Sequence, residues 1–106
     1  MPKYLLKVNY TAEGVRGVIK DGGTKREAAA RALVESLGGS IEAFYFSFGE
    51  ADAFLICEFP STSGALAGAM AVNASGAVTL STTQLITPAE VDAAAKMTAK
   101  YSAPGA

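Results

Sequence analysis

The chain has 106 residues, of which 50% are hydrophobic and 18% are charged, and its formal net charge is −1. This length suits one domain, and the high apolar content excludes an intrinsically disordered chain. A charge near zero gives no reason to expect a nucleic-acid partner. The sequence has no histidine and a single cysteine, Cys57, so it can form no intrachain disulfide and lacks the usual nitrogen and sulfur ligands of a metal. We therefore expect no metal site and no cofactor.

The sequence shows no targeting signal and no membrane-spanning segment. Its N-terminus has no apolar signal core. The longest stretch without a charged residue, residues 60–89, is interrupted by Ser, Thr, Asn, Gly and Pro, which is atypical of a membrane span. We expect a cytoplasmic protein with no membrane partner.

Residues 4–10 form the first predicted strand, because this short run is rich in β-forming side chains. Thr11 can cap a helix after this strand, but the glycines that follow predict only a short turn of helix before a break at residues 22–23. The alternation of the strand places four large side chains on one face: Tyr4, Leu6, Val8 and Tyr10.

A capping box at residues 24–27 predicts the start of a longer helix, with Thr24 as the cap and Glu27 as its reciprocal partner. Apolar residues at helical spacing continue to Leu37. The glycines at residues 38–39 then end the helix.

Two neighbouring runs predict a β-hairpin. Residues 40–48 are rich in aromatic side chains and predict the second strand, and residues 53–59 predict the third. The four residues 49–52 form a loop of typical hairpin length. Alternation divides the second strand into Phe44, Phe46 and Phe48 on one face and Ile41, Ala43 and Tyr45 on the other.

The last part of the chain predicts a helix over residues 61–76 and a fourth strand over residues 77–86. Thr87, a following proline and a glutamate at the third helical position then predict a capped helix that runs to about Lys100. Residues 102–106 are expected to be a frayed tail.

This order of elements predicts an α+β fold of the ferredoxin-like βαββαβ type with an extra C-terminal helix. Its antiparallel sheet is expected to have the strand order 4-1-3-2. We expect a single domain over residues 1–101.

Apolar side chains on the sheet indicate self-association. A ferredoxin-like sheet carries helices on one face, and its other face is polar if it meets water. Here Phe54, Ile56 and aromatic residues of the second strand make that face apolar, which predicts a homodimer or a larger homo-oligomer. The helix over residues 61–76 has no charged residue, so we expect it to lie against a neighbouring subunit or under the C-terminal helix.

A polar set on the sheet is the first candidate site. Lys7, Asn9, Asp52 and Glu58 share one face if the first strand pairs with the third, and they could bind a small polar ligand or position a proton donor. An ion pair at a subunit interface explains the same residues without a ligand. Tyr45 is a further candidate for hydrogen bonding to a ligand, together with Tyr4 and Tyr10, although a buried tyrosine usually packs and pairs its hydroxyl.

Two other features have simpler explanations than a site. The segment Gly22–Arg26 opens a helix with two cations and could hold an anion, but it lacks the full phosphate-loop pattern, so capping accounts for it. Cys57 lies mid-strand on an apolar face and is expected to be a core thiol.

Short motifs along most of the chain match one family pattern as a set. The main ones are Asn9-Tyr10-Thr11, Gly22-Gly23-Thr24-Lys25-Arg26, Leu33 to Gly39, Phe44-Tyr45-Phe46, Ala71 to Gly76 and Leu85-Ile86-Thr87-Pro88. From about Lys3 to Ala95 the chain thus resembles the GYD-domain family of small bacterial proteins. The family takes its name from a Gly, a Tyr and an Asp near the turn after the second strand; this chain has Gly49 and Asp52, with Ala51 where the Tyr is expected. The resemblance implies a ferredoxin-like domain that forms a dimeric α/β barrel with two sheets packed face to face.

Two functions from different classes fit these features. The first is a small homo-oligomeric binding or accessory protein with no chemistry of its own, which could bind a small molecule. The second is a cofactor-free α/β-barrel enzyme, an oxygenase or isomerase, that acts on a small hydrophobic substrate. A closed, dry, apolar pocket between sheet and helices would favour the enzyme, and a filled core would favour the first function. We expect the first.

Overall fold

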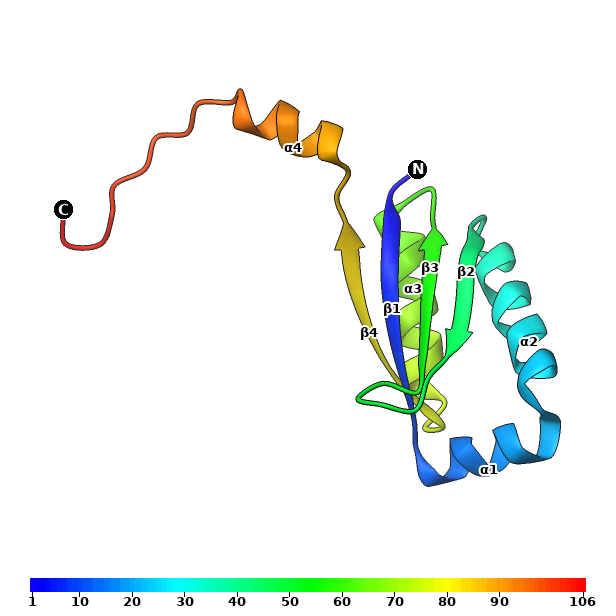
Figure 1. Cartoon of the computed structure of the whole chain (residues 1–106). Coiled ribbons are helices and arrows are strands. Elements are labelled where there is room, and N and C mark those ends of the chain that lie inside the picture. Colours follow the sequence, from blue (N-terminus) through cyan, green and yellow to red (C-terminus); the bar gives the residue numbers. More distant parts are fainter.

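The computed structural model describes all 106 residues and shows a four-stranded sheet with four helices (Figure 1). The elements in chain order are β1 (Lys3–Tyr10), α1 (Ala12–Asp21), α2 (Gly23–Ser36), β2 (Ser40–Phe46), β3 (Ala53–Glu58), α3 (Thr62–Ala74), β4 (Val78–Leu85) and α4 (Pro88–Ala95). Every neighbouring pair of strands is antiparallel, and the sheet order is β2-β3-β1-β4. The predicted α+β, ferredoxin-like fold and its strand order are confirmed.

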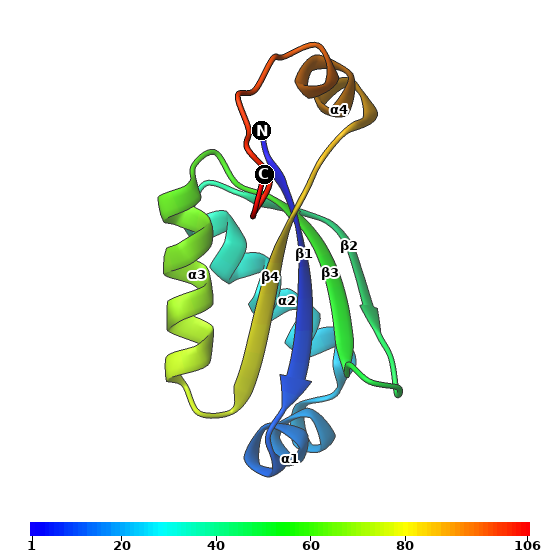
Figure 2. The ribbon, with the colours of Figure 1, turned by 90° about the vertical axis from the view of Figure 1, so that its left-hand side faces the viewer.

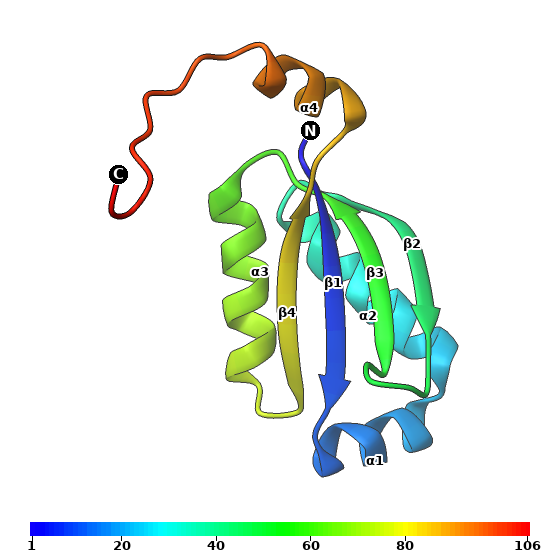
Figure 3. The same cartoon turned by 60° about the vertical axis from the view of Figure 1, so that its left-hand side comes forward.

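The two long helices lie on one face of the sheet, which we call the inner face (Figure 2). Helix α2 packs on β2 and α3 packs on β4, so each helix covers one edge of the sheet. Helix α1 crosses the end of the sheet below β1 (Figure 3). The inner face of the two central strands, β1 and β3, lies between these helices and carries the most buried side chains.

The core lies between the inner face and these helices. The predicted face of β1 is the buried one, because Tyr4, Leu6 and Val8 are each at most 8% exposed. Tyr4 meets Phe59 edge to face, with ring centroids 5.9 Å apart, a favoured aromatic geometry. The remaining core residues come from five other elements and are Val34, Ile41, Ala53, Leu55, Cys57, Ala65 and Val78.

A β-bulge in β2 changes which of its side chains face the core. The register with β3 shifts between Ile41 and Ala43, so that both Ile41 and Phe44 point to the inner face. The predicted grouping of Ile41 with Ala43 and Tyr45 is therefore wrong. An unpaired residue inserted in a strand reverses the alternation beyond it. Arg31 supports the bulge, because its Nη1 donates a hydrogen bond of 3.2 Å to the carbonyl oxygen of Ile41.

The helices after β1 differ from the prediction in two ways. Thr11 caps α1 as expected and accepts a hydrogen bond from the Gly14 amide, but α1 is a full helix of 10 residues, not a short turn. Gly22 has φ 83° and joins α1 directly to α2, so α2 begins at Gly23 with no side-chain cap. The capping box predicted at Thr24 is wrong because the turn at Gly22 has already started the helix. Glu27 accepts a 2.9 Å hydrogen bond from Arg31 instead.

Two element ends also fall earlier than predicted. Strand β2 stops at Phe46, because the Ser47 side chain and backbone both donate hydrogen bonds into the following loop, to Ala51 and Asp52 respectively. Helix α4 ends at Ala95 and not near Lys100. Its last turn tightens into i→i−3 bonds at Lys96 and Met97, as is common at the end of a helix.

The chain beyond β4 leaves the rest of the fold. We call residues 86–106 the arm and residues 2–85 the body. Figure 1 shows α4 and the final residues beyond the end of β4, and every residue of the arm is exposed. Of the two positions expected for α3, the one under the C-terminal helix is therefore wrong within one chain, and the one against a neighbouring subunit stays a prediction. None of the four helices has the length and apolar character needed to cross a membrane.

Candidate functional site

A large hollow lies between α1, the C-terminal end of α3 and the inner face. Its volume is about 490 Å³, and it is partly open to solvent. The residues that line it with large or charged side chains are Tyr10, Glu13, Asp21, Arg26, Leu33, Val72 and Val78. We call this space the α1 hollow.

A second, smaller space continues from the hollow over the middle of the sheet. This sheet cavity has a volume of about 110 Å³, and 12 of its 13 lining residues are hydrophobic. Arg26 is its one charged lining residue. The two spaces share five lining residues, which are Tyr10, Arg26, Leu33, Val72 and Val78. The two spaces therefore adjoin, the α1 hollow with six hydrophobic residues among its 12 lining residues and the sheet cavity almost wholly apolar, and Arg26 and Tyr10 line both.

The site exists because small side chains stand where the helices approach the centre of the sheet. Ala29 and Ala30 on α2 line the sheet cavity, and Ala71 on α3 lines the α1 hollow. Since α2 and α3 pack on the two edges of the sheet, alanines on their facing sides leave space above β1. Protein interiors otherwise hold few voids larger than a water molecule.

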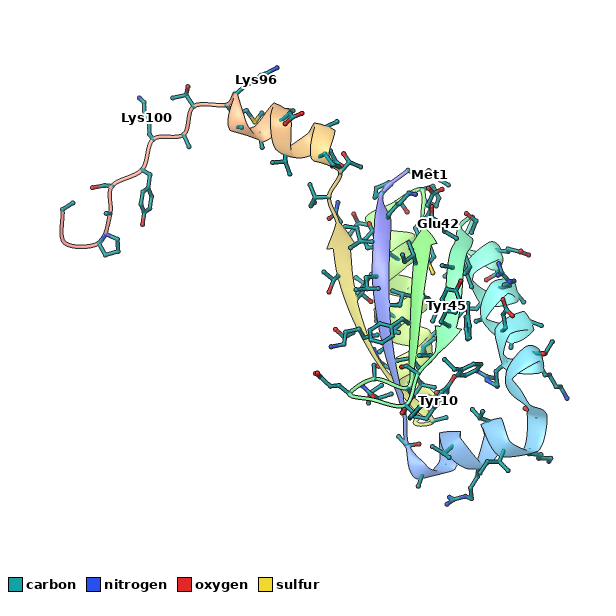
Figure 4. All side chains as sticks on the ribbon, viewed as in Figure 1. Met1, Tyr10, Glu42, Tyr45, Lys96 and Lys100 are labelled. Atoms are coloured by element: carbon teal, nitrogen blue, oxygen red, sulfur yellow. The ribbon has the colours of Figure 1, made fainter.

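Tyr10 lies at the end of β1 (Figure 4), where hydrogen bonds fix its backbone. Its backbone amide donates a 2.8 Å hydrogen bond to Oδ2 of Asp52. The Asp52 amide in turn donates to the carbonyl oxygen of Val8, also at 2.8 Å. Next to Tyr10, Thr11 donates from its backbone amide and its hydroxyl to the carbonyl oxygen of Ala77, at 3.0 and 3.2 Å. These bonds join the end of β1 to the loops before β3 and β4 and fix one wall of the site.

Arg26 is the cation best placed to meet a ligand. It lies in the first turn of α2, is half-buried, and forms no ion pair within 4.0 Å. Its neighbour Lys25 is paired with Asp21 at 3.8 Å, and Arg31 is paired with Glu27 at 2.9 Å. An arginine without a carboxylate partner at an apolar site can bind an anionic group through charge-assisted hydrogen bonds.

The structure does not bring the predicted polar set together as one site. Strand β1 does pair with β3, but Lys3 lies opposite Glu58 and Lys7 lies opposite Phe54, so Glu58 is at the other end of the strand from Lys7 and Asn9. Lys7 is 3.6 Å from the highly exposed Glu50, and Asn9 is exposed. Asp52 binds the Tyr10 amide, which gives it a positioning role at the α1 hollow.

Glu58 and Tyr45 lie, like Lys7 and Asn9, on the face of the sheet that points away from the helices, the outer face. Glu58 is 3.6 Å from Lys3, which also donates a 2.6 Å hydrogen bond to Glu42. That bond raises the pKa of the Lys3 ammonium, so Lys3 stays protonated in the neutral range. Tyr45 is 73% exposed and lies opposite Phe54. Its hydroxyl can therefore contact a partner on the outer face, but it cannot reach a ligand in the α1 hollow on the other side of the sheet.

Arg26 is not among the predicted site residues, and the sequence gives only a weak indication that it faces the site. It lies four residues before Ala30 and seven before Leu33, so it extends the apolar stripe of α2 by one turn. A single cation in an apolar stripe is the signal that distinguishes it from the solvent-facing Lys25.

The Cys57 thiol has no ligand role in this geometry. Burial raises the pKa of the Cys57 thiol to about 11, and its side chain is fully covered, so it is protonated and inert at neutral pH. No group of three or more acidic or cysteine side chains is close enough together to hold a metal ion.

A comparison with protein-family models identifies the family of this chain. The GYD domain model matches residues 4–95. The chain belongs to the GYD domain family. Among curated proteins, none matches it. In this GYD domain, Asp52 of the family's name-giving turn fixes the end of β1, and Ala51 beside it is 1% exposed.

Proposed function

We propose that this GYD domain is a homo-oligomeric protein that binds a small, mainly apolar ligand between its helices and its sheet. The observation that carries the proposal is the apolar sheet cavity that adjoins the larger, more polar α1 hollow. The α1 hollow, about 490 Å³, falls within the range of roughly 300–1,000 Å³ that is usual for ligand pockets. Apolar walls with a few polar groups are also typical of such pockets.

The shape and charge of the site favour a small apolar acid. The sheet cavity of about 110 Å³ is somewhat smaller than the roughly 150 Å³ cavity that accommodates benzene in an apolar protein core. It suits a branched alkyl group or, with slight adjustment, one ring. A carboxylate attached to that group would lie beside the unpaired Arg26. Glu13 and Asp21, which line the α1 hollow, would disfavour a ligand with several negative charges.

A titration with benzoate and 3-methylbutanoate, followed by amide chemical shifts in NMR, tests this function. We expect shifts at the lining residues Val8, Ala29 and Leu33 and a dissociation constant at least tenfold weaker in Arg26→Gln. The matched control is Lys25→Gln, which removes the neighbouring cation outside the site and should leave binding unchanged. Benzyl alcohol should bind wild type and Arg26→Gln equally. Shifts confined to the outer face, or equal loss in both variants, would contradict the proposed site.

The outer face supports the homo-oligomeric part of the proposal. Leu5, Ile56 and Leu85 are only half-buried there, and Phe54 is 37% exposed between Lys7 and Tyr45. Packing two such faces together would form the dimeric α/β barrel expected from the family. Sedimentation of Ile56→Asp should show monomers at micromolar concentration, because the substitution places an unpaired charge in the interface. Thr79→Asp, at an exposed outer-face position at the start of β4, is the control and should weaken association less.

A cofactor-free oxygenase or isomerase is the second candidate function, since Tyr10 and Glu13 are titratable groups in the same hollow. The partial opening of the hollow to solvent in the single chain favours binding over this alternative, which needs a closed, dry site. Mass spectrometry of bound ligands after incubation in air separates the two functions. An unchanged ligand supports the binding protein. A product that is lost in Tyr10→Phe, while ligand binding persists, supports the enzyme.

A further inference from the structure

The arm has the features of a segment that packs on another molecule. Its apolar side chains Ile86 and Val91 are each 56% exposed, Met97 is 79% exposed and Tyr101 is 80% exposed. The radius of gyration of the chain is 17.1 Å and its longest extent is 57 Å. A compact chain of this length has a radius of gyration of about 13 Å. The arm therefore makes the chain elongated, and its apolar side chains are not buried against the rest of the chain.

Helix α4 is well specified but uncovered. Thr87 and Glu90 form a complete capping box, and Pro88 occupies the first turn. These groups determine where the helix starts, yet a helix of eight residues is marginal in water without packing. On this helix Pro88, Val91 and Ala95 lie on one side at spacings of three and four residues. That apolar side is available to a partner, while Glu90 and Asp92 flank it.

Helix α3 presents a complementary uncovered surface. Leu66 and Met70 are 58% and 63% exposed, and their spacing of four residues places them next to each other on one side of the helix. Ser63, Ala67 and Ala74 on the same side are small and exposed, so another helix could approach closely. No charged residue occurs between residues 61 and 76, so this side has no group that favours water over an apolar partner.

The arm and this side of α3 do not meet within one chain. Figures 1 and 3 show α4 beyond the end of the sheet and not along α3. Lys96 and Lys100 extend from the arm at a distance from the body (Figure 4). Each chain thus carries one uncovered apolar segment and one uncovered apolar helix side of matching character.

We infer that the arm of one chain packs on α3 of a second copy, with Val91 against Leu66 and Met70. In a two-fold dimer the exchange is reciprocal, so each arm covers the α3 helix of the other chain. Asp92 and Lys96 then lie at the rim of the contact, where they stay in water. This interface uses neither the ligand site nor the outer face, so it goes beyond the proposed function and can fail or hold independently of it.

Disulfide trapping between two different chains tests this contact. Val91→Cys in one chain and Met70→Cys in a chain with a distinguishable tag are mixed in a glutathione buffer at pH 8. Both positions are exposed, so neither substitution threatens folding, and the buried Cys57 thiol does not compete. A disulfide needs the two β-carbons about 3.5–4.5 Å apart, so the mixed species reports a direct contact. We expect at least half of the mixture to form it.

In the control mixture, the Val91→Cys chain is combined with a chain that carries Arg16→Cys, at an exposed position on α1. We expect less than one-tenth as much mixed disulfide as with Met70→Cys. Equal trapping at both positions would overturn the inference. A chain that carries both Val91→Cys and Met70→Cys tests the remaining arrangement. If it closes an internal disulfide as a monomer and the mixture traps nothing between chains, the arm packs on its own α3 and the inference is wrong.

Discussion

The body and the arm of this GYD domain are both built from well-formed elements, but different interactions hold them. In the body, β1 pairs along its length with β3 and β4, and hydrogen bonds from Thr11 and Asp52 tie its end to loops far away in the sequence. In the arm, the bonds are local: the capping box of α4 and the tightened turn after it. Local bonds determine that a helix forms, whereas long-range bonds and burial determine where it lies.

The largest effect that tests this comparison is expected at Gly14, where the body is tightest. A β-carbon added there would lie far inside van der Waals contact of the Ala77 carbonyl oxygen and 3.1 Å from Cδ1 of Tyr10. Gly14→Ala should therefore lower the free energy of unfolding by about 3 kcal/mol or more, the upper range for overpacking. Urea denaturation followed by circular dichroism measures it.

Gly17 provides a matched control in the same helix. A β-carbon at this position meets nothing within 4 Å, so Gly17→Ala should stabilise the protein by about 0.5–1 kcal/mol through helix propensity. Equal effects of the two substitutions would show that α1 is not closely packed against the loop before β4.

A smaller effect is expected at Asp52, whose carboxylate accepts the hydrogen bond of the part-buried Tyr10 amide. Asp52→Ala leaves that amide without a partner and should cost about 1–3 kcal/mol. Asp52→Asn keeps an acceptor oxygen and should cost less. Asp92→Ala on the exposed arm is the control, expected within about 0.5 kcal/mol of wild type. If Asp52→Ala were equally harmless, Tyr10 would be positioned by other contacts.

The smallest effect on the body is expected from a change in the arm. Thr87→Ala removes the cap of α4 and should destabilise this helix by about 1 kcal/mol. At concentrations where the chain is monomeric, hydrogen exchange should show faster exchange at the α4 amides and no change in the β1 amides. A parallel loss of protection in β1 would mean that arm and body unfold together.

The parts of the fold that depend on local pattern could be predicted from the sequence. Alternation gave the buried face of β1, and Thr87 with Glu90 gave the start of α4. The capping pattern at Thr24 failed because a neighbouring residue, Gly22, adopts a positive φ that starts the helix sooner. The prediction of which β2 side chains share a face was wrong at Ile41, because a single sequence gives no clear sign of a β-bulge.

The candidate site was harder to predict, since it depends on where helices leave space. Arg26 is next to Lys25 in the sequence, yet only Arg26 lines the cavity. The expected sharing of one sheet face makes Asp52 a candidate for ligand binding, but in the structure its carboxylate accepts a hydrogen bond from the Tyr10 backbone amide. Packing of α2 and α3 on opposite edges of the sheet, which creates the cavity, is a property of the assembled fold and not of any short motif.

The central position of β1 has a consequence for the order of events during synthesis. Strand β1 is the first to leave the ribosome, but its two neighbours are β3 and β4, and the second of them ends at Leu85. At a translation rate of about 5–20 residues per second, β1 waits about 4–15 s for its last partner. Sheets that need such distant pairings fold slowly. The apolar face of the nascent strand is therefore exposed to chaperones and to other chains until translation of the sheet is almost finished.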